Sequence, residues 1–263
     1  MSDLRHPTAI IHPNARLADD VSVGPYSIIG EHVEIGAGTI IGPHVVVDGH
    51  TSIGKGNRIF QFSSIGEIPQ DKKYKGEPTR LVIGDNNTIR ENCTFNLGTV
   101  QDGGVTSIGN DNWIMAYVHV AHDCHIADHN VIANSVQFAG HVTVGNHTLI
   151  GGISGIHQFV RIGDFAMIGF QTRVSQDIPP FVTAVGNPAE AKGPHQEGPR
   201  RAGFSAPRVD MLKQIYRTLY RAGSSFDTAK KELAALRGQV PEADADIDNM
   251  LTFLNNASRG IVR

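Results

Sequence analysis

Apolar residues recur at every sixth position along most of the chain, in three series that are separated by residues 66–82 and 98–107. A period of six fits neither an α-helix, with about 3.6 residues per turn, nor a lone strand, with about 2. It is typical of a parallel β-helix with three short sides per coil, in which each inward residue stacks on the residue 18 positions away. The repeated positions are Ile11, Leu17, Val23, Ile29, Ile35, Ile41, Val47, Ile53, Ile59 and Ile65; then Ile83, Ile89 and Phe95; then Ile108, Ile114, Val120, Ile126, Ile132, Phe138, Val144, Ile150, Ile156, Ile162, Ile168 and Val174.

The alternative fold is an antiparallel β-sandwich with frequent turns. Such a sandwich would show alternation with a period of two and no strict phase of six. Glycine often follows the apolar position, as in Ile29-Gly30 and Ile162-Gly163, and it relieves the backbone at a turn. The pattern therefore predicts an all-β solenoid built of hexapeptide repeats.

Two segments break the period. Residues 66–82 carry Asp71 and Glu77 where apolar residues are expected, and residues 98–107 shift the phase, because Phe95 and Ile108 are 13 positions apart rather than 12. We expect both segments to be loops. Loops on a rigid scaffold often carry binding groups.

The period ends after Val174, and proline and glycine between residues 179 and 199 predict an irregular connector. Ser205 is a candidate cap for a first helix that ends near Gly223, Ser225 precedes a second helix, and a third helix is expected around residues 247–254. We divide the chain into a β-helix domain, residues 1–190, and a connector with a C-terminal helical domain, residues 191–263. A solenoid must cover its ends and flat faces, so we expect an oligomer.

Composition narrows the class of protein. The 263 residues are 40% hydrophobic and 19% charged, with a net charge of −3, which fits a folded protein and excludes an overall basic nucleic-acid binder. The N-terminus lacks the apolar stretch of a secretory signal, and no apolar run reaches the length of a membrane span. The two cysteines, Cys93 and Cys124, are too few for a disulfide framework, which is consistent with the cytoplasm.

The densest polar cluster is His119-Val120-Ala121-His122-Asp123-Cys124-His125. One interpretation is a zinc site, but residues six apart lie on neighbouring sides of a three-sided coil, so His119 and His125 diverge. A second interpretation is a group of solvated surface histidines. A third is a general base, whose tautomer Asp123 or a backbone carbonyl would fix.

The 18-residue spacing adds to the third interpretation. Gly140 stacks one coil below His122, and His141 stacks one coil below Asp123. A glycine beside a base can offer an unobstructed backbone N–H to a developing oxyanion. We expect no metal and no cofactor at this site.

Several longer motifs carry a resemblance to a known family. The sequence resembles the UDP-N-acetylglucosamine O-acyltransferases that begin lipid A synthesis, over nearly the whole chain. The matching segments are residues 70–80 (QDKKYKGEPTR), 119–124 (HVAHDC), 139–142 (AGHV), 150–152 (IGG), 157–159 (HQF), 176–180 (QDIPP) and 259–263 (RGIVR).

The resemblance implies a left-handed β-helix that forms a homotrimer with active sites between subunits. It implies that His122 deprotonates the sugar 3-hydroxyl, which attacks the thioester of a 3-hydroxyacyl-acyl carrier protein, and that the Gly140 N–H stabilises the oxyanion. The residues implied to hold the sugar nucleotide or the pantetheine arm are Asp71, Lys73, His119, His141, Gln158 and Arg201. Those implied to line the acyl chain are Gly152, His157, Met167 and Phe170.

Phe170 stands where the family often has glycine at the end of the acyl groove. A phenyl ring there removes room for several methylene groups, each worth roughly 0.8 kcal/mol when buried. We therefore predict a preference for short acyl chains, of about ten carbons or fewer by this volume argument. The alternative is that Phe170 faces another side or packs in a subunit interface.

The chain departs from the family pattern at Asn96-Leu97 and at Ala202. A basic residue at position 202 would contact the phosphates of the nucleotide, and its loss weakens that binding. Two alternative functions therefore remain: a paralogue that acylates a different nucleotide sugar, and a non-catalytic paralogue that binds a sugar nucleotide or the carrier protein.

Overall fold

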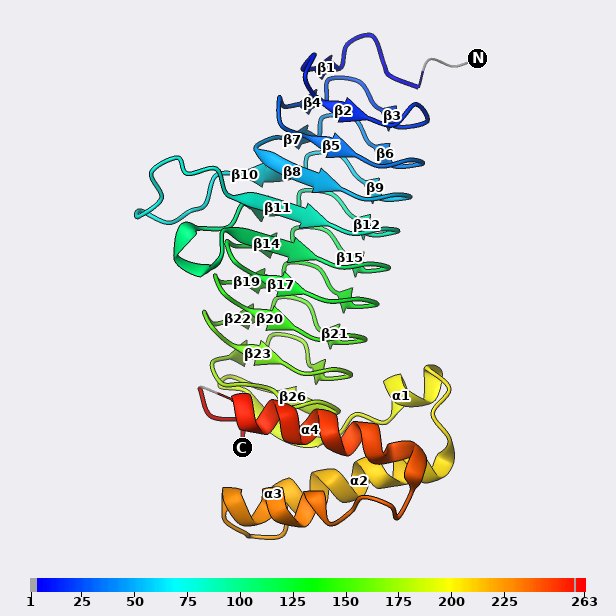
Figure 1. Ribbon diagram of the computed structural model, residues 1–263, viewed down its shortest axis with the longest axis vertical. Coiled ribbons are helices and arrows are strands. Elements are labelled where there is room, and N and C mark those ends of the chain that lie inside the picture. Colours follow the sequence, from blue (N-terminus) through cyan, green and yellow to red (C-terminus); the bar gives the residue numbers. More distant parts are fainter. Residues whose placement is uncertain (1–3, 258) are drawn as a thin grey trace.

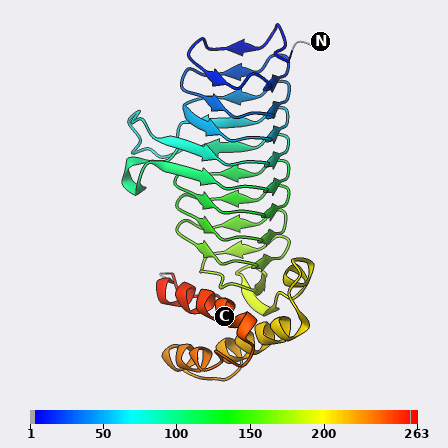
Figure 2. The ribbon, with the colours of Figure 1, turned by 45° about the vertical axis from the view of Figure 1, so that its right-hand side comes forward.

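A computed structural model describes residues 4–257 and 259–263, and it is a stack of three-sided coils closed at one end by helices (Figures 1 and 2). Each coil contributes one short strand to each of three sheets, and strands three apart in sequence order pair in parallel along the stack. Pairing joins residues 18 apart over most of the stack, as at Val120 and Phe138. This is the stacking that the period of six predicts.

The first sheet holds nine strands and carries His119, the first residue of the polar cluster. They are β1 (Ile10–Ile11), β4 (Ile28–Ile29), β7 (Val46–Val47), β10 (Ser64–Glu67), β13 (Thr94–Asn96), β16 (His119–Val120), β19 (Gln137–Phe138), β22 (Gly155–Ile156) and β25 (Arg173–Val174). The second sheet holds β2 (Arg16–Leu17), β5 (Glu34–Ile35), β8 (His50–Ile53), β11 (Arg80–Ile83), β14 (Val105–Ile108), β17 (His125–Ile126), β20 (Thr143–Val144) and β23 (Arg161–Ile162).

The third sheet runs from β3 to a terminal hairpin. Its strands are β3 (Ser22–Val23), β6 (Ile40–Ile41), β9 (Arg58–Ile59), β12 (Thr88–Ile89), β15 (Trp113–Ile114), β18 (Val131–Ile132), β21 (Leu149–Ile150), β24 (Met167–Ile168), β26 (Val182–Val185) and β27 (Glu190–Pro194). The apolar residues of the period fill the interior of the coils; Ile65, Ile114 and Ile132, for example, are fully buried.

Both predicted loops are present and project from the same edge of the stack (Figures 1 and 2). They are shorter than predicted, because the strands on either side are longer than two residues. Strands β10 and β11 leave residues 68–79 as the first loop. Strands β13 and β14 leave residues 97–104 as the second, which contains the short 3-10 helix η1 (Val100–Asp102).

The connector after Val174 is more regular than the sequence indicates. Strand β27 pairs antiparallel with β26 and so extends the third sheet, and a helix follows it, α1 (Glu197–Arg201). The expectation of an irregular connector is therefore wrong for residues 182–201. Single prolines and glycines are tolerated here because β27 is an edge strand. The division of the chain after residue 190 stays a prediction.

The three predicted helices are confirmed as α2 (Ala206–Tyr220), α3 (Phe226–Ala234) and α4 (Asp244–Asn256), with a short 3-10 helix η2 (Pro241–Ala243) before the last. The Ser205 and Ser225 side chains accept hydrogen bonds from backbone N–H groups in the first turns of α2 and α3, as N-caps do. The helices pack a second apolar cluster against Phe181, below the last coil. None of the helices in the described residues is long and apolar enough to span a membrane.

Candidate active site

The turn between β16 and β17 holds a histidine and a carboxylate in contact. His122 Nδ1 lies 2.9 Å from Asp123 Oδ2, and the two side chains are 11% and 0% exposed. Because a carboxylate only accepts, Nδ1 is the donor, and the lone pair of the neutral imidazole is on Nε2. His122 lines a cavity of about 500 Å³, so a substrate hydroxyl can reach this base.

The loop between β13 and β14 completes the shell around Asp123. Thr99 donates its backbone N–H to Asp123 Oδ1 at 2.7 Å and its hydroxyl to Oδ2 at 2.6 Å. Burial raises the pKa of Asp123, but the hydrogen bonds from His122 and Thr99 outweigh it and leave the pKa below its ordinary value. Asp123 is therefore a carboxylate, and it fixes the tautomer of His122.

The next coil brings Gly140 and His141 beneath this pair, as the 18-residue spacing predicts. The backbone N–H of His141 donates to the carbonyl of His122 at 3.0 Å. The two imidazole rings meet edge to face at 5.0 Å. The Gly140 N–H makes no hydrogen bond to any part of the chain that the structure describes, and Gly140 lines the cavity of His122. It is available to an oxygen that gains charge during a reaction.

The two outer histidines of the possible zinc site, His119 and His125, lie on different sheets, as the spacing predicts. His119 lies on β16 and bonds Thr94 Oγ1 at 2.8 Å, whereas His125 lies on β17 and bonds Ser107 Oγ, also at 2.8 Å. The potential ligand atoms that do approach one another, within 4.8 Å, belong to His122, Asp123 and His141. Both oxygens of that carboxylate already accept protein hydrogen bonds, so we interpret the group as a hydrogen-bonded network.

Comparisons with known proteins match this architecture along its length. A family model for bacterial transferase hexapeptides (six repeats) covers residues 106–140, and one for domain 2 of UDP-N-acetylglucosamine O-acyltransferase covers residues 177–262. The acyl-[acyl-carrier-protein]–UDP-N-acetylglucosamine O-acyltransferase of Thiobacillus denitrificans is 58% identical over 98% of both chains. The chain belongs to this family of acyltransferases.

Solved structures of the family agree. The UDP-N-acetylglucosamine O-acyltransferase of Moraxella catarrhalis is 48% identical, covers 99% of this chain and 100% of its own, and superposes with a TM-score of 0.95. The acyltransferase of Arabidopsis is 35% identical over 98% of this chain and 99% of its own, with a TM-score of 0.83. The predicted fold class, a left-handed parallel β-helix with a C-terminal helical domain, is confirmed.

Several residues that the family resemblance implies lie around the cavity of His122. His119, His157 and Gln158 line it together with His122 and Gly140. The cavity is also lined by four polar or flexible positions that the sequence analysis did not single out as site residues, namely Gln70, Gln137, Gly155 and Arg173. Gln137, Gly155 and Arg173 follow His119 at steps of 18, so the stacking arithmetic could have found them.

The first loop holds Asp71 and Lys73 beside the site but not in the lining of this cavity. The backbone N–H of Lys73 donates to the Asp71 carboxylate at 2.9 Å, which is a local turn rather than an ion pair between side chains. The Lys73 side chain is exposed. Asn96 anchors the start of this loop, because its side-chain amide donates to the carbonyls of Glu67 and Ile68.

The remaining predicted residues lie apart from His122 within one chain. Gly152 and Phe170 lie in stacked turns before the strands of the first sheet, whereas His122 lies in a turn after them, and Phe170 is 65% exposed. Met167 lies on β24, in the third sheet. Arg201 pairs with Glu197 and lines a separate cavity of about 390 Å³, with His147 and His195.

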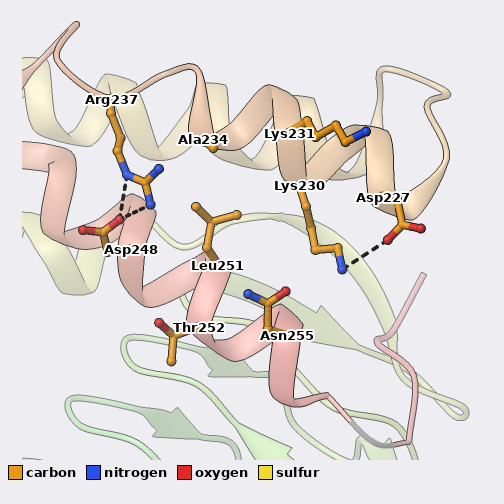
Figure 3. A pocket seen from close by; sticks show the side chains of 9 residues that line it. All are labelled: Asp227, Lys230, Lys231, Ala234, Arg237, Asp248, Leu251, Thr252 and Asn255. Carbon is orange, nitrogen blue, oxygen red and sulfur yellow. Dashed lines mark hydrogen bonds and ion pairs between the residues drawn. The ribbon is translucent and has the colours of Figure 1, made fainter.

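A larger cavity, of about 790 Å³, lies between α3 and α4 (Figure 3). Its charged groups are paired in part, Arg237 with Asp248 and Lys230 with Asp227. It contains no histidine or thiol and none of the residues that the sequence predicts. We therefore place the chemistry at the smaller cavity, where a buried histidine–carboxylate pair meets an unbonded N–H group.

Proposed function

We propose that this chain transfers a 3-hydroxyacyl group from acyl carrier protein to the 3-hydroxyl of UDP-N-acetylglucosamine, the first step of lipid A synthesis. The proposal rests on one observation. His122, whose ring is held by Asp123, lines the same cavity as Gly140, whose N–H has no partner in the described residues. The relatives named for this reaction, more than half identical over the whole chain, support the substrates.

In the proposed reaction, His122 Nε2 takes the proton of the sugar 3-hydroxyl as its oxygen attacks the thioester carbonyl. The C–O bond forms, and the carbonyl oxygen gains negative charge, which the Gly140 N–H stabilises. The tetrahedral intermediate then expels the pantetheine sulfur, and His122 returns the proton to it. Asp123 stays ionised and stabilises the imidazolium in between.

We propose a homotrimer with its sites between subunits, as the resemblance implies. The support from the structure is a column of apolar side chains left exposed on one chain, in the turns between the third and the first sheet. Exposed side chains there include Tyr26, Phe62, Tyr117, Ile153 and Phe170, each more than half exposed. Large apolar side chains exposed along one edge of a fold are typical of an interaction site. A neighbouring subunit would cover it and bring its Arg201 and Phe170 toward the cavity that His122 and His157 line.

We also propose that Phe170 ends the acyl groove, so that short chains are preferred. A Cβ on Gly152 would lie 3.7 Å from the Phe170 ring, so the ring lies beside Gly152. Gly152, which has no side chain, would leave room for the acyl chain. Met167 and Phe170 would line the end of the groove. Asp71, Lys73, His119, His141 and Gln158 would hold the sugar nucleotide or the pantetheine arm.

The test is a turnover assay with UDP-N-acetylglucosamine and 3-hydroxyacyl-acyl carrier proteins of increasing chain length. We expect activity in the wild type and a loss of at least about 100-fold in kcat for His122→Ala, with substrate binding retained. His125→Ala is the matched control, because it removes a histidine three positions away that lies on β17, outside the cavity. Equal rates for the wild type and His122→Ala would refute the assignment of the base.

A further inference from the structure

The loop of residues 97–104 contacts two side chains of the site, Asp123 and His141. Besides the two hydrogen bonds from Thr99 to Asp123, it places Asp102 Oδ2 at 2.6 Å from His141 Nδ1. The Asp102 side chain is half exposed, whereas that of His141 is only 10% exposed. One loop outside the hexapeptide period thus contacts both Asp123, the carboxylate next to the base, and His141.

His141 is held on three further sides. Its ring stacks on Phe159 with centroids 4.4 Å apart and an angle of 16° between planes, and it meets the His122 ring nearly at right angles. Its Nε2 lies 3.8 Å from Asp123 Oδ2. His141 therefore packs directly against the ring of His122, and a rotation of the His141 ring would leave His122 room to move.

We propose that Asp102 is a positioning residue for the acyl transfer and that it acts through His141. A carboxylate only accepts hydrogen bonds, so Asp102 places a proton on His141 Nδ1 and fixes the plane of that ring. The fixed ring holds His122 against Asp123 with Nε2 toward the cavity. The inference rests on the proposed function, in which His122 is the base.

The hydrogen bond between Asp102 and His141 can control the position of the His122 ring. A shift of about 1 Å in a catalytic group can cost on the order of 100-fold in rate, even when the change lies far from the reacting atoms. Asp102 lies on the surface of the loop and contributes little to folding, so its removal acts on the rate rather than on stability. Asn at position 102 keeps an oxygen that accepts the Nδ1 proton.

The first experiment is a double-mutant cycle on kcat with Asp102→Ala, His141→Gln and the double variant. We expect Asp102→Ala to lower kcat about 10-fold with KM changed less than about 2-fold, and to add no further loss in the His141→Gln background. Asp102→Asn is expected to recover most of the rate. Gln101→Ala, one residue away on the same exposed loop, is the control and keeps the wild-type rate. Independent losses in the double variant, or a wild-type rate in Asp102→Ala, would overturn the proposal.

The second experiment needs no turnover. In protein labelled with ¹⁵N-histidine, the signals of His141 are identified by their absence from His141→Gln. We expect a protonated Nδ1 in the wild type and in Asp102→Asn, and a changed tautomer pattern in Asp102→Ala. If the chain fails to acylate UDP-N-acetylglucosamine, the proposed function falls, while this spectrum still decides whether Asp102 fixes His141. An unchanged His141 spectrum in Asp102→Ala would refute the contact.

Discussion

Gly140 lies one coil below His122 with no space between them for a side chain. A Cβ on Gly140 would be 2.5 Å from Cε1 and 2.7 Å from Nε2 of the imidazole. Gly140 is not among the glycines with a positive φ, so the backbone does not require a glycine here. The ring of the base requires it, and the same absence of a side chain leaves the N–H open to the cavity.

Gly140→Ala is therefore expected to displace His122 and to lower kcat by about 100-fold. The clash is with the end of a side chain that can rotate, so the cost in folding is the hydrogen bond between His122 and the Asp123 carboxylate, about 1.5–3 kcal/mol for a bond to a charged group. Steady-state kinetics and urea unfolding measure the two effects separately.

Gly193→Ala is the matched control for this substitution. A Cβ on Gly193 would meet no heavy atom within 4 Å, and this glycine also lacks a positive φ. It should keep the wild-type rate and stability. A Gly140→Ala enzyme as fast as this control would show that the base and the glycine are not coupled.

Phe170→Gly is expected to move the optimum toward longer donors. The ring is the bulkiest group at the proposed end of the groove, and its removal opens room for several methylenes at roughly 0.8 kcal/mol each. The measurement is kcat/KM for ten-, twelve- and fourteen-carbon 3-hydroxyacyl donors, in the wild type and the variant. If the wild type already turns over the fourteen-carbon donor faster than the ten-carbon one, Phe170 does not limit the chain length.

The two thiols are expected to be inert in the native protein. Burial raises the pKa of both Cys93 and Cys124 to about 12, and both side chains are fully buried. At pH 8 neither is a thiolate, which is the reactive form. A thiol-reactive dye should label the native protein hardly at all and label two sites per chain in guanidinium. Rapid labelling of either site without denaturant would contradict the burial.

The period of six predicted more of the site than motif spacing alone. Because each coil is 18 residues, the spacing alone predicts Gly140 under His122 and His141 under Asp123, and both placements are confirmed. The same arithmetic separated His119 from His125. A regular solenoid converts distance along the chain directly into distance in space, so its stacked positions are predictable.

The positions of Thr99 and Asp102 in the site could not be predicted from the sequence. They lie in the loop that interrupts the period, where no fixed step relates a residue to the coil beside it. The hairpin of β26 and β27 was missed because its prolines and glycines are typical of an irregular connector, although an edge strand tolerates them. Arg201 and Phe170 lie away from His122 in one chain, and the step of 18 residues relates neither of them to His122.

His119 makes the stability of the fold depend on pH in a defined direction. Burial lowers the pKa of His119 below its ordinary value; a hydrogen bond from the His119 ring to the Thr94 backbone opposes this, and the nearby His122 adds to it. Between the lowered pKa and the unfolded value near 6.5, the unfolded chain binds more protons than the folded one, so the free energy of unfolding rises with pH across that window and levels off above about pH 6.5.

His119→Gln removes this titration, and glutamine retains a group that can hydrogen-bond Thr94 Oγ1. The free energy of unfolding in urea, measured from pH 5 to pH 8, should therefore fall less steeply toward low pH in the variant than in the wild type. Because other histidines titrate in both proteins, the difference between the two curves is the quantity that isolates His119. Parallel curves would mean that burial of His119 is relieved in solution, and a steeper curve for the variant would reverse the sign of the argument.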